Sequence, residues 1–542
     1  MKKTENKVIW LLKRIIFGVA TGLIGFALFM ILLNIIFPNT EYKISLNTEA
    51  GMSSKQRVSD FKDMTEFIEK SVPFIYDYEE LYGISFEDMK NYYVGLVGNA
   101  ESDYEYYCLV QGFINNIPSG HMSMGYPNVD YVPMLYQHRT GDYPQFGQAC
   151  GYWESTLQNE CRKYYDKDYS LHAFYYLDGE YVESEYTKSE NNIPYRGARL
   201  LSVNGVPADE FVKLCPLSGK LHYDFQNGKP FRESIIFNDM NGEECTVEYE
   251  TESGEIISEN AYYGTSSVVF NYIEYFRSID NPSENAKENS DIEEADIPNI
   301  YSFFDEDRNA VYIKFNDFSL GGSEALNFIR ENDMPDNIII DLRENGGGMA
   351  AVCHTFIEEL TARNFEYNTP IYVTPAESEY GEYTAKKAKE LPFETKFKKL
   401  FKDIRTEKFE GKSEREYNIY VLVSHFSVSA ADKFASIIKD HGLGTVIGVF
   451  NTGGEAYGSP DIKVLKKSGL YFYYTPFKSL NRDGTDNSVY GTSPDIYVTL
   501  NDEFFIKRDE LLLQGEPYGT YENRLKWDGV LIRALEETEK NN

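Results

Sequence analysis

The sequence is poor in basic residues and in cysteine. Its 53 lysines and arginines face 86 aspartates and glutamates, which leaves a formal net charge of −33 over 542 residues. Nucleic-acid binding needs clustered lysine and arginine, so no nucleic-acid partner is expected. The chain has six cysteines, no Cys-x-x-Cys pair and no His/Cys cluster with zinc-site spacing, so no metal site is expected either.

The six cysteines leave two alternatives open. They are Cys108, Cys150, Cys161, Cys215, Cys245 and Cys353. Disulfides would be permitted if this part of the chain lies outside the cytoplasm, but the spacing does not choose a connectivity. Packing as buried free thiols explains the cysteines equally well.

The clearest topological signal is an uncharged apolar run over residues 15–37. Five basic residues precede it: Lys2, Lys3, Lys7, Lys13 and Arg14. At ~1.5 Å per residue the run is long enough to cross ~30 Å of hydrocarbon as a helix. A cleaved signal peptide is the alternative, but its apolar region would be shorter and end in small residues, whereas this run ends at Phe37 and Pro38. We predict a cytoplasmic tail over 1–14, a membrane anchor over 15–37 and an extracytoplasmic remainder.

Three regions are expected between the anchor and the core. Apolar residues at helical spacing in 54–118 predict a helical N-terminal region, which we bound at 38–190, with 139–190 left unassigned. Residues 191–256 form a small separate module, with a tight turn at Asn204-Gly205 and an alternating strand near 244–249. Residues 257–299 are a connector that ends in an acidic linker.

The remaining residues, 300–542, alternate strand and helix patterns. The expected strands are 310–315, 337–342 and 418–423, and the expected helices are 324–332, 349–361 and 527–537. Fully apolar strands alternating with helices predict a sheet with helices packed on it. The fold class is therefore α/β with α+β elements.

One strand-to-helix junction carries a serine at its turn. The strand 418–423 runs into Ser427, Val428 and Ser429, and a helix pattern follows at once. A helix N-terminus offers free N–H groups that favour negative charge, as an acyl-transfer enzyme requires. Ser429 is therefore a candidate nucleophile, with helix capping as the alternative.

A second junction ends in three glycines. Gly346, Gly347 and Gly348 follow the strand 337–342, and glycine lets backbone N–H groups approach a ligand closely. A phosphate cradle would need Gly-Lys-Ser/Thr here, but Met349 and Ala350 follow instead. An oxyanion hole needs only positioned backbone amides, and a flexible turn is the plainer alternative.

The two junctions together resemble the S41 family of serine peptidases, which includes the C-terminal processing (tail-specific) proteases and the tricorn core protease. The similar segments are 341–348, 427–432, 445–454 and 491–498. The resemblance implies a ClpP/crotonase-like βα core, a helical N-terminal cap over 38–190 and a PDZ-like module over 191–256. It also implies a peptide or protein substrate and no cofactor.

The same resemblance assigns roles to residues. Ser429 would be the nucleophile, and the amides of Ala430 and Gly348, or less favourably Gly347, would form the oxyanion hole. Tail-specific proteases use a lysine at the end of the glycine turn, where this chain has Gly454. The tricorn-like branch takes a histidine from a turn before the PDZ-like module, which would make His121 the general base.

The acid that orients the base has no exact counterpart. The tricorn-like branch places a glutamate just before the Gly-x-x-Pro-Asp strand, where this chain has Ser488-Val489-Tyr490, so Asp486 is the nearest candidate. A neutral Ser488 or Asn487 could orient the ring instead. Of the other histidines, His425 lies four residues before Ser429 but matches no base of the family. His354 and His441 suit packing or surface roles.

Three further residues are expected to be structural. They are Asp432, near the start of the serine helix, and Asp341 and Arg343, which should pair with each other or a neighbour. The sequence thus predicts a membrane-anchored extracytoplasmic serine peptidase that uses Ser429 and His121. A catalytically inactive peptide-binding scaffold of the same fold, or a peptidase with a different base, is the alternative.

Overall fold

The computed structural model describes most of the chain. The described residues are 44–127, 143–163, 171–183, 197–214, 219–238, 243–263, 300–331, 335–374, 389–391, 400–500 and, with short gaps between 501 and 518, those up to 541. The predicted tail (1–14), the predicted anchor (15–37) and most of the connector lie outside them. Within the described ranges, no helix is long and apolar enough to span a membrane.

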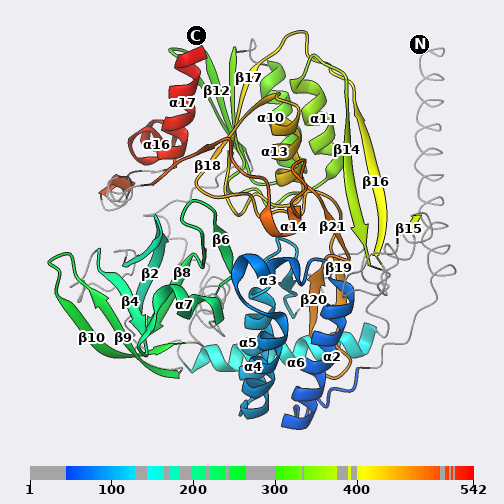
Figure 1. Ribbon diagram of the computed structural model, residues 1–542, viewed down its shortest axis with the longest axis vertical. Coiled ribbons are helices and arrows are strands. Elements are labelled where there is room, and N and C mark those ends of the chain that lie inside the picture. The colour runs from blue at the N-terminus through cyan, green and yellow to red at the C-terminus, as the bar shows by residue number, and fades with distance from the viewer. Residues whose placement is uncertain are drawn as a thin grey trace, which may run out of the picture.

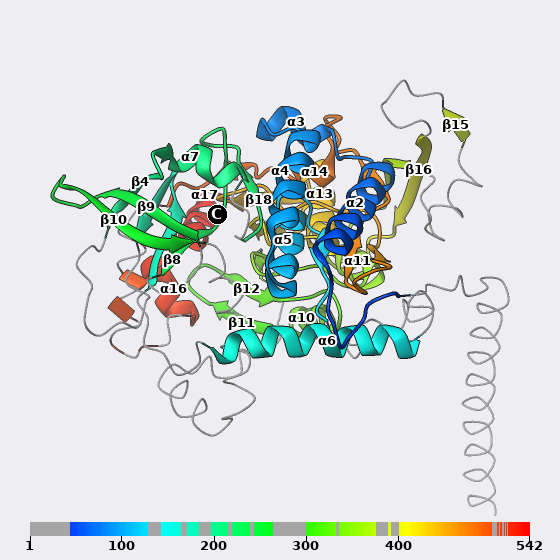
Figure 2. The same cartoon turned by 90° about the horizontal axis from the view of Figure 1, so that it is seen from below.

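The N-terminal region is helical, as predicted. Its helices are α2 (Ser54–Ser71), α3 (Asp77–Tyr82), α4 (Phe86–Asn99), α5 (Asp103–Asn115) and α6 (Tyr143–Arg162). Ser53, Ser85 and Ser102 cap α2, α4 and α5 by accepting a hydrogen bond from a first-turn amide. The buried faces form an aromatic-rich core, in which Phe61 and Tyr93 pack edge-on against Phe113. Helix α6 crosses the others (Figures 1 and 2). Helix α5 ends at Asn115, six residues before His121.

A seven-stranded antiparallel sheet follows, in the order β3-β2-β8-β10-β9-β4-β5. Its strands are β2 (Leu171–Leu177), β3 (Glu180–Glu183), β4 (Arg199–Val203), β5 (Val206–Pro207), β8 (Ser234–Asn238), β9 (Glu243–Glu250) and β10 (Ile256–Tyr263). The predicted turn joins β4 to β5, with left-handed φ values of 52° at Asn204 and 74° at Gly205. Strands β2 and β3 come from the stretch 139–190, for which no element was predicted. We call residues 171–263 the β module.

Within the β module, a two-stranded hairpin makes the contact with the core. It consists of β6 (His222–Asp224) and β7 (Lys229–Phe231). Gln226 Nε2 donates to the carbonyl of Val449 at 2.7 Å, and Phe231 stacks on Phe450 with ring centroids 4.6 Å apart. The hairpin therefore packs directly against the core, at the loop that contains Val449 and Phe450.

The core is built on a six-stranded sheet in the order β11-β12-β13-β17-β18-β22. Its strands are β11 (Ile300–Asp305), β12 (Ala310–Phe315), β13 (Asn337–Asp341), β17 (Asn418–Val423), β18 (Gly444–Gly448) and β22 (Ile496–Tyr497). All neighbouring pairs are parallel except β11 with β12. The three predicted strands are β12, β13 and β17, and the mixed α/β fold is confirmed.

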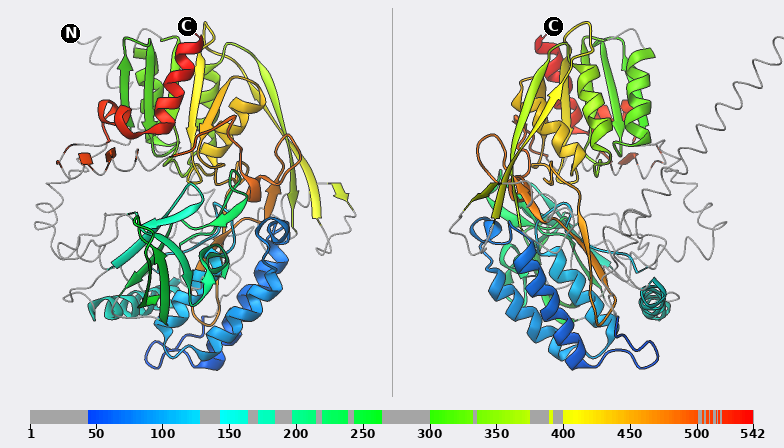
Figure 3. Two further views of the ribbon diagram at one scale, coloured as in Figure 1. Left: turned by 60° about the vertical axis from the view of Figure 1, so that its left-hand side comes forward. Right: turned by 90° about the vertical axis from the view of Figure 1, so that its right-hand side faces the viewer.

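Helices cover both faces of this sheet, as Figures 1 and 3 show. They are α10 (Leu320–Glu331), α11 (Ala350–Leu360), α13 (Ala430–Asp440), α16 (Tyr521–Trp527) and α17 (Gly529–Asn541). Ile338 and Ile340 of β13 share a core with α10, α11 and α13, whereas Ile339 packs with α17. Successive side chains of a strand point to opposite faces, so a continuous apolar run is buried on both.

The parallel register brings the two predicted junctions together. Asp341 lies opposite Leu422, so β13 and β17 end at the same edge of the sheet. The glycine turn leaves β13 there, and the serine turn leaves β17 beside it. This edge faces the N-terminal helices and the β module, which lie below the core in Figure 1.

Two smaller sheets join the core to the N-terminal helices. Their strands are β14 (Phe365–Val373), β15 (Lys389–Leu391), β16 (Leu400–Phe409) and β21 (Phe477–Ser479) in one, and β1 (Ser123–Met124), β19 (Asp461–Val464) and β20 (Tyr471–Tyr474) in the other. In the second, Ser123 pairs with Tyr473. This pairing fixes the chain directly after His121 against the end of β20.

Four of the six cysteines have described side chains. Cys108, Cys150, Cys245 and Cys353 are buried, and Cys150 and Cys353 are free thiols. All four pack in apolar clusters, and for Cys150 and Cys353 the second of the two sequence alternatives holds. The side chains of Cys161 and Cys215 are outside the described part.

Candidate active site

Ser429 is the first residue of the α13 turn, but its side chain does not cap the helix. Its backbone has φ 59° and ψ −117°, an uncommon conformation for a residue other than glycine, and its hydroxyl makes no capping hydrogen bond. Such a conformation costs on the order of 1–3 kcal/mol and persists only where surrounding contacts impose it. Since Ser429 does not cap α13, the capping alternative does not account for it.

The contacts that impose this turn come from three neighbouring segments. The amide of Ser429 donates to the carbonyl of Gly454 at 3.0 Å, and the amide of Val428 donates to the carbonyl of Asn345 at 3.2 Å. Ser427 is buried and its hydroxyl donates to the carbonyl of Leu342 at 2.7 Å. Ser427 thus has a structural role, while the hydroxyl of Ser429 stays available.

The glycine turn lies against the serine turn. A methyl group added at Gly347 would come within 2.7 Å of Ser429 Cβ and 3.1 Å of the Ala430 nitrogen, and Gly347 has φ 112°. Only glycine fits this combination of space and backbone conformation. The amide of Gly347 donates to Asn345 Oδ1 at 2.9 Å and is therefore already used.

Two amides near Ser429 remain for an anion. Ala430 begins α13, where a helix has no internal acceptor for the N–H group. Gly348 is exposed and follows the turn at φ 129°, and no acceptor for its amide occurs within the described ranges. The arrangement favours Gly348 and Ala430 over Gly347 as oxyanion donors.

His121 lies in a short turn between α5 and β1, and this turn packs against the serine turn. A methyl group added at Gly120 would come within 2.2 Å of Val428 Cγ1, which leaves no space between the two turns. His121 Nδ1 is 3.3 Å from Thr475 Oγ1. Because Nδ1 faces Thr475, Nε2 is the nitrogen available to another group. No hydrogen bond joins His121 to Ser429 in the described part of the chain; such bonds often tighten only when substrate binds.

The carboxylate beside His121 belongs to Glu455, which the sequence did not suggest. Glu455 Oε2 lies 3.7 Å from His121 Nδ1, and the two side chains are only 1% and 10% exposed. Its other oxygen accepts a hydrogen bond from the hydroxyl of Ser119. Glu455 directly follows Gly454 in the turn that holds the Ser429 amide, so the same turn supports both groups.

Both members of this pair resist ionisation. Burial lowers the pKa of His121 to about 3, and the charge of Lys220 acts in the same direction. Burial also raises the pKa of Glu455 to about 7, although Ser119 and Lys220 oppose the rise. The resting pair is therefore a neutral imidazole beside a carboxyl group that titrates near neutral pH.

Lys220 of the β module supports the histidine turn. Its amine donates to the carbonyls of Ser119 and Met122, on either side of His121. Burial lowers the pKa of the Lys220 ammonium to about 8, while Glu455 opposes this shift. A lysine is thus present near the site, but it contacts backbone carbonyls.

Asp486, the predicted orienting acid, is engaged elsewhere. Its Oδ1 accepts from the amide of Ser488 at 2.9 Å as the N-cap of α14 (Asn487–Tyr490), and its Oδ2 lies 3.4 Å from Lys478 Nζ. None of its contacts within the described ranges is with His121. The structure places Glu455, not Asp486, beside the imidazole, because α14 directs Asp486 towards Lys478.

The residues expected to be structural do pair with neighbours. Arg343 binds Asp341, with Nη2 2.6 Å from Oδ2, and also Asp528 at 2.6 Å. Asp432 is buried and accepts a hydrogen bond from Thr452 Oγ1. These contacts fix the end of β13 and the start of α13, next to the turn that carries Ser429.

The other candidate histidines lie away from Ser429. His354 Nε2 is 3.3 Å from Glu358 Oε1 one turn along α11, and His441 is the C-cap residue of α13. His425 turns towards the β module, with Nε2 3.1 Å from Glu233 Oε1. Of the histidines named here, His121 is the one beside the serine turn.

Residues 309–498 match the family model of peptidase family S41. No curated protein sequence matches the chain.

Several solved structures are similar at low identity. They include mature CPAF (12% identity, TM-score 0.48, 89% of this chain and 98% of that one), the photosystem II D1 C-terminal processing protease (13%, 0.33, 82% and 94%) and the tricorn protease (13%, 0.31, 90% and 37%).

Proposed function

Since this chain is a serine-type peptidase of family S41, we propose that Ser429 is its nucleophile, that His121 is the general base and that Glu455 orients and stabilises the base. The observation that carries the proposal is the buried Glu455 carboxyl, 3.7 Å from His121 Nδ1, the ring nitrogen that also faces Thr475. The uncapped Ser429 hydroxyl on the adjoining turn supports it.

The proposed reaction has two steps. Ser429 Oγ attacks the peptide carbonyl while His121 Nε2 accepts the hydroxyl proton and then passes it to the leaving amine, which breaks the C–N bond. A water molecule next gives a proton to His121 and attacks the acyl-enzyme, and the proton returns to Ser429 as the acid product leaves. The amides of Gly348 and Ala430 bind the oxyanion, and loss of one such donor costs on the order of 10²–10³-fold in rate.

The charges of the site suit this sequence. His121 is unprotonated throughout the neutral pH range, because its pKa lies far below 7, and is therefore in the form that can accept a proton. An imidazole of such low pKa is a weak base, so the charge of an ionised Glu455 is needed to raise its basicity. The imidazolium exists only once the proton has moved, and the ionised Glu455 then neutralises it. Glu455 thus stabilises the transition state more than the resting enzyme, as catalysis requires.

The finer descriptions of fold and location belong to the same proposal. We assign the core to the ClpP/crotonase-like type and the β module to the PDZ-like type, with the closed antiparallel sheet of the module in support. The N-terminal helices would cap the site, and the module would bind an extended peptide by strand addition or gate its access. The apolar run 15–37 supports a membrane anchor with the peptidase outside the cytoplasm.

A fluorophosphonate that acylates activated serines tests the nucleophile without a known substrate. The wild-type protein should be labelled, and S429A should not be. S323A is the matched control, because Ser323 is exposed on α10 and its hydroxyl donates to the carbonyl of Ser319 within the same helix region. Labelling of S429A at the wild-type rate would exclude Ser429.

The inactive scaffold is the second candidate, and the missing hydrogen bond between His121 and Ser429 favours it. In that case the wild-type protein would stay unlabelled at every pH and would still bind peptides. H121A distinguishes the two, since loss of a general base should slow labelling by ~10²–10⁴-fold. No labelling of either protein would support the scaffold, whereas equal labelling of wild-type and H121A protein would mean that the base is not His121.

A further inference from the structure

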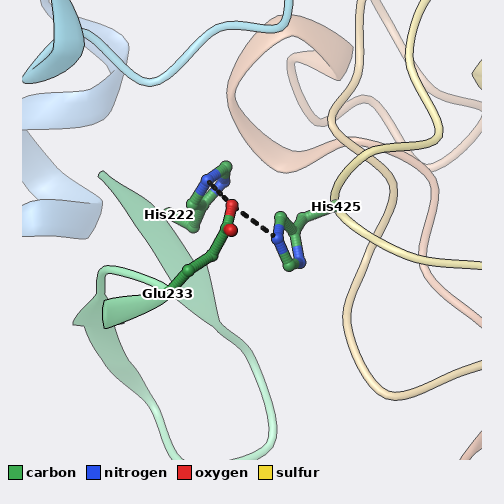
Figure 4. A group of neighbouring side chains, drawn as sticks. All are labelled: His222, Glu233 and His425. Carbon is green, nitrogen blue, oxygen red and sulfur yellow. Dashed lines mark hydrogen bonds and ion pairs between the residues drawn. The ribbon is translucent and has the colours of Figure 1, made fainter. Parts of the chain in front are cut away.

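Two imidazoles and one carboxylate from distant parts of the chain meet at the junction of the β module and the core (Figure 4). His222 belongs to β6, Glu233 follows β7, and His425 lies in the loop that leads to Ser429. Each can offer one ligand atom, and these atoms lie within 4.8 Å of one another. Glu233 and His425 are 192 positions apart, so no sequence spacing reveals the group.

The separations suit a tetrahedral metal ion. Two ligands each ~2.05 Å from zinc, at the tetrahedral angle, are about 3.3 Å apart. Glu233 Oε1 lies 3.1 Å from His425 Nε2 and 3.6 Å from His222 Nε2, on either side of that value. The ligand atoms of the two imidazoles lie within 4.8 Å of each other, so side-chain rotations that shorten this separation by at most about 1.5 Å would complete the geometry.

The surroundings also fit a metal site. Among the described residues, His222 Nε2 is buried without a hydrogen-bond partner, with Glu233 Oε1 3.6 Å away, and buried polar atoms are seldom left so. Phe231 lies against both imidazoles, with ring centroids 5.4 Å and 5.6 Å away, and Phe450 covers His425 from another side at 5.3 Å. An apolar shell of this kind strengthens ligation, and the 45% exposure of Glu233 leaves an entry path.

We propose that His222, Glu233 and His425 form a divalent-cation site, with zinc the ion that best suits two imidazoles and one carboxylate. Three protein ligands of this set leave a fourth position for water. The site is separate from the peptidase relay and does not depend on Ser429 being the nucleophile.

A bound ion would link three parts of the molecule. His425 is in the loop that ends at Ser429, Glu233 follows the hairpin of the β module, and His222 is two residues after Lys220. Lys220 in turn holds the carbonyls on either side of His121. The ion would therefore bind the β module to the loop of the nucleophile and, through Lys220, to the turn of the base.

The test is zinc titration of the full chain carrying S429A, after removal of metal with a chelator. We expect one zinc ion per chain by calorimetry, and a melting temperature that rises with zinc concentration, because the ion binds only the folded arrangement. H222Q, E233Q and H425Q should each weaken zinc binding by more than the ~10-fold that loss of an outer-shell partner costs.

The matched control is H354Q. His354 also lies beside a glutamate, Glu358, but among the described residues it belongs to no group of three potential metal ligands. H354Q should bind zinc as the parent does, and each variant should melt at the parent's temperature without zinc. Cobalt absorbance tests the donor atoms: bands of a nitrogen and oxygen set are expected, and a thiolate band would assign the ion to cysteine instead. Undiminished zinc binding in the three variants, or none in the folded parent, would overturn the proposal.

Discussion

Replacing Glu455 by glutamine separates its proposed role from that of a buried packing residue. The volume is kept, and the amide oxygen can still accept from the Ser119 hydroxyl. The charge that meets the imidazolium is lost. The new amide can also donate to His121 Nδ1, which would place the imidazole proton on Nε2, the nitrogen that should accept from Ser429.

The size of the effect follows from the distance. At 3.7 Å between Glu455 Oε2 and His121 Nδ1, and at an effective dielectric constant of ~20, the ion pair is worth about 4.5 kcal/mol. Since ~1.36 kcal/mol changes a rate tenfold, E455Q should slow acylation of Ser429 by about 10³-fold where Glu455 is ionised.

The pH profile gives a second, independent reading. Wild-type acylation should rise as the pH passes 7, because the pKa of Glu455 is raised to about 7 and only its ionised form stabilises the imidazolium. His121 does not add a second transition to the pH profile near pH 7, since its pKa is about 3. E455Q should lose this rise.

The assay is the second-order rate of fluorophosphonate labelling between pH 5 and 9, with the melting temperature measured on the same samples. D486N is the matched control, because Asp486 is equally buried but faces Lys478, and it should keep the wild-type profile. An E455Q protein that melts like the wild type, labels within a few-fold of it and keeps its pH profile would refute the reasoning.

Two further predictions concern the same site. G347A should abolish labelling, because the added methyl group would lie 2.7 Å from Ser429 Cβ and because Gly347 has φ 112°. G346A is the control, since a methyl group there meets open space, and it should be labelled normally. Normal labelling of G347A would contradict the close packing of the glycine and serine turns. K220M should move the midpoint of the pH profile of labelling to higher pH, because the charge of Lys220 lowers the pKa of Glu455. K213M is the control, since Lys213 pairs with Glu210 away from the site, and its midpoint should not move. An unchanged midpoint in K220M would show that Lys220 does not influence the titration of Glu455.

The closeness of Ser429 to the glycine turn could be predicted, because both turns follow strands that pair in register in a parallel sheet. Each follows a continuous apolar strand, and in-register parallel pairing places strand ends side by side. The turn at Asn204 and the helices α2 to α5 were also within reach, since their signals lie within a few residues.

Glu455 was missed because its role depends on contacts far from it in the sequence. Its partner Ser119 is 336 positions away. Asp486 was preferred for its position before a motif, but the cap it provides for α14 and its contact with Lys478 could not be seen from spacing. The His222, Glu233 and His425 cluster was hidden in the same way.

The pairing of β1 with β20 has a consequence for the order in which the molecule is completed. The strand β1, two residues after His121, pairs with β20 (Tyr471–Tyr474). The two segments are far apart in the sequence, since His121 and its neighbour Thr475 are 354 positions apart. During synthesis the turn of Ser429 therefore emerges before the strand that fixes the segment of His121. If these two residues act together as proposed, the active site cannot assemble until β20 has formed, so the growing chain on the ribosome would be inactive.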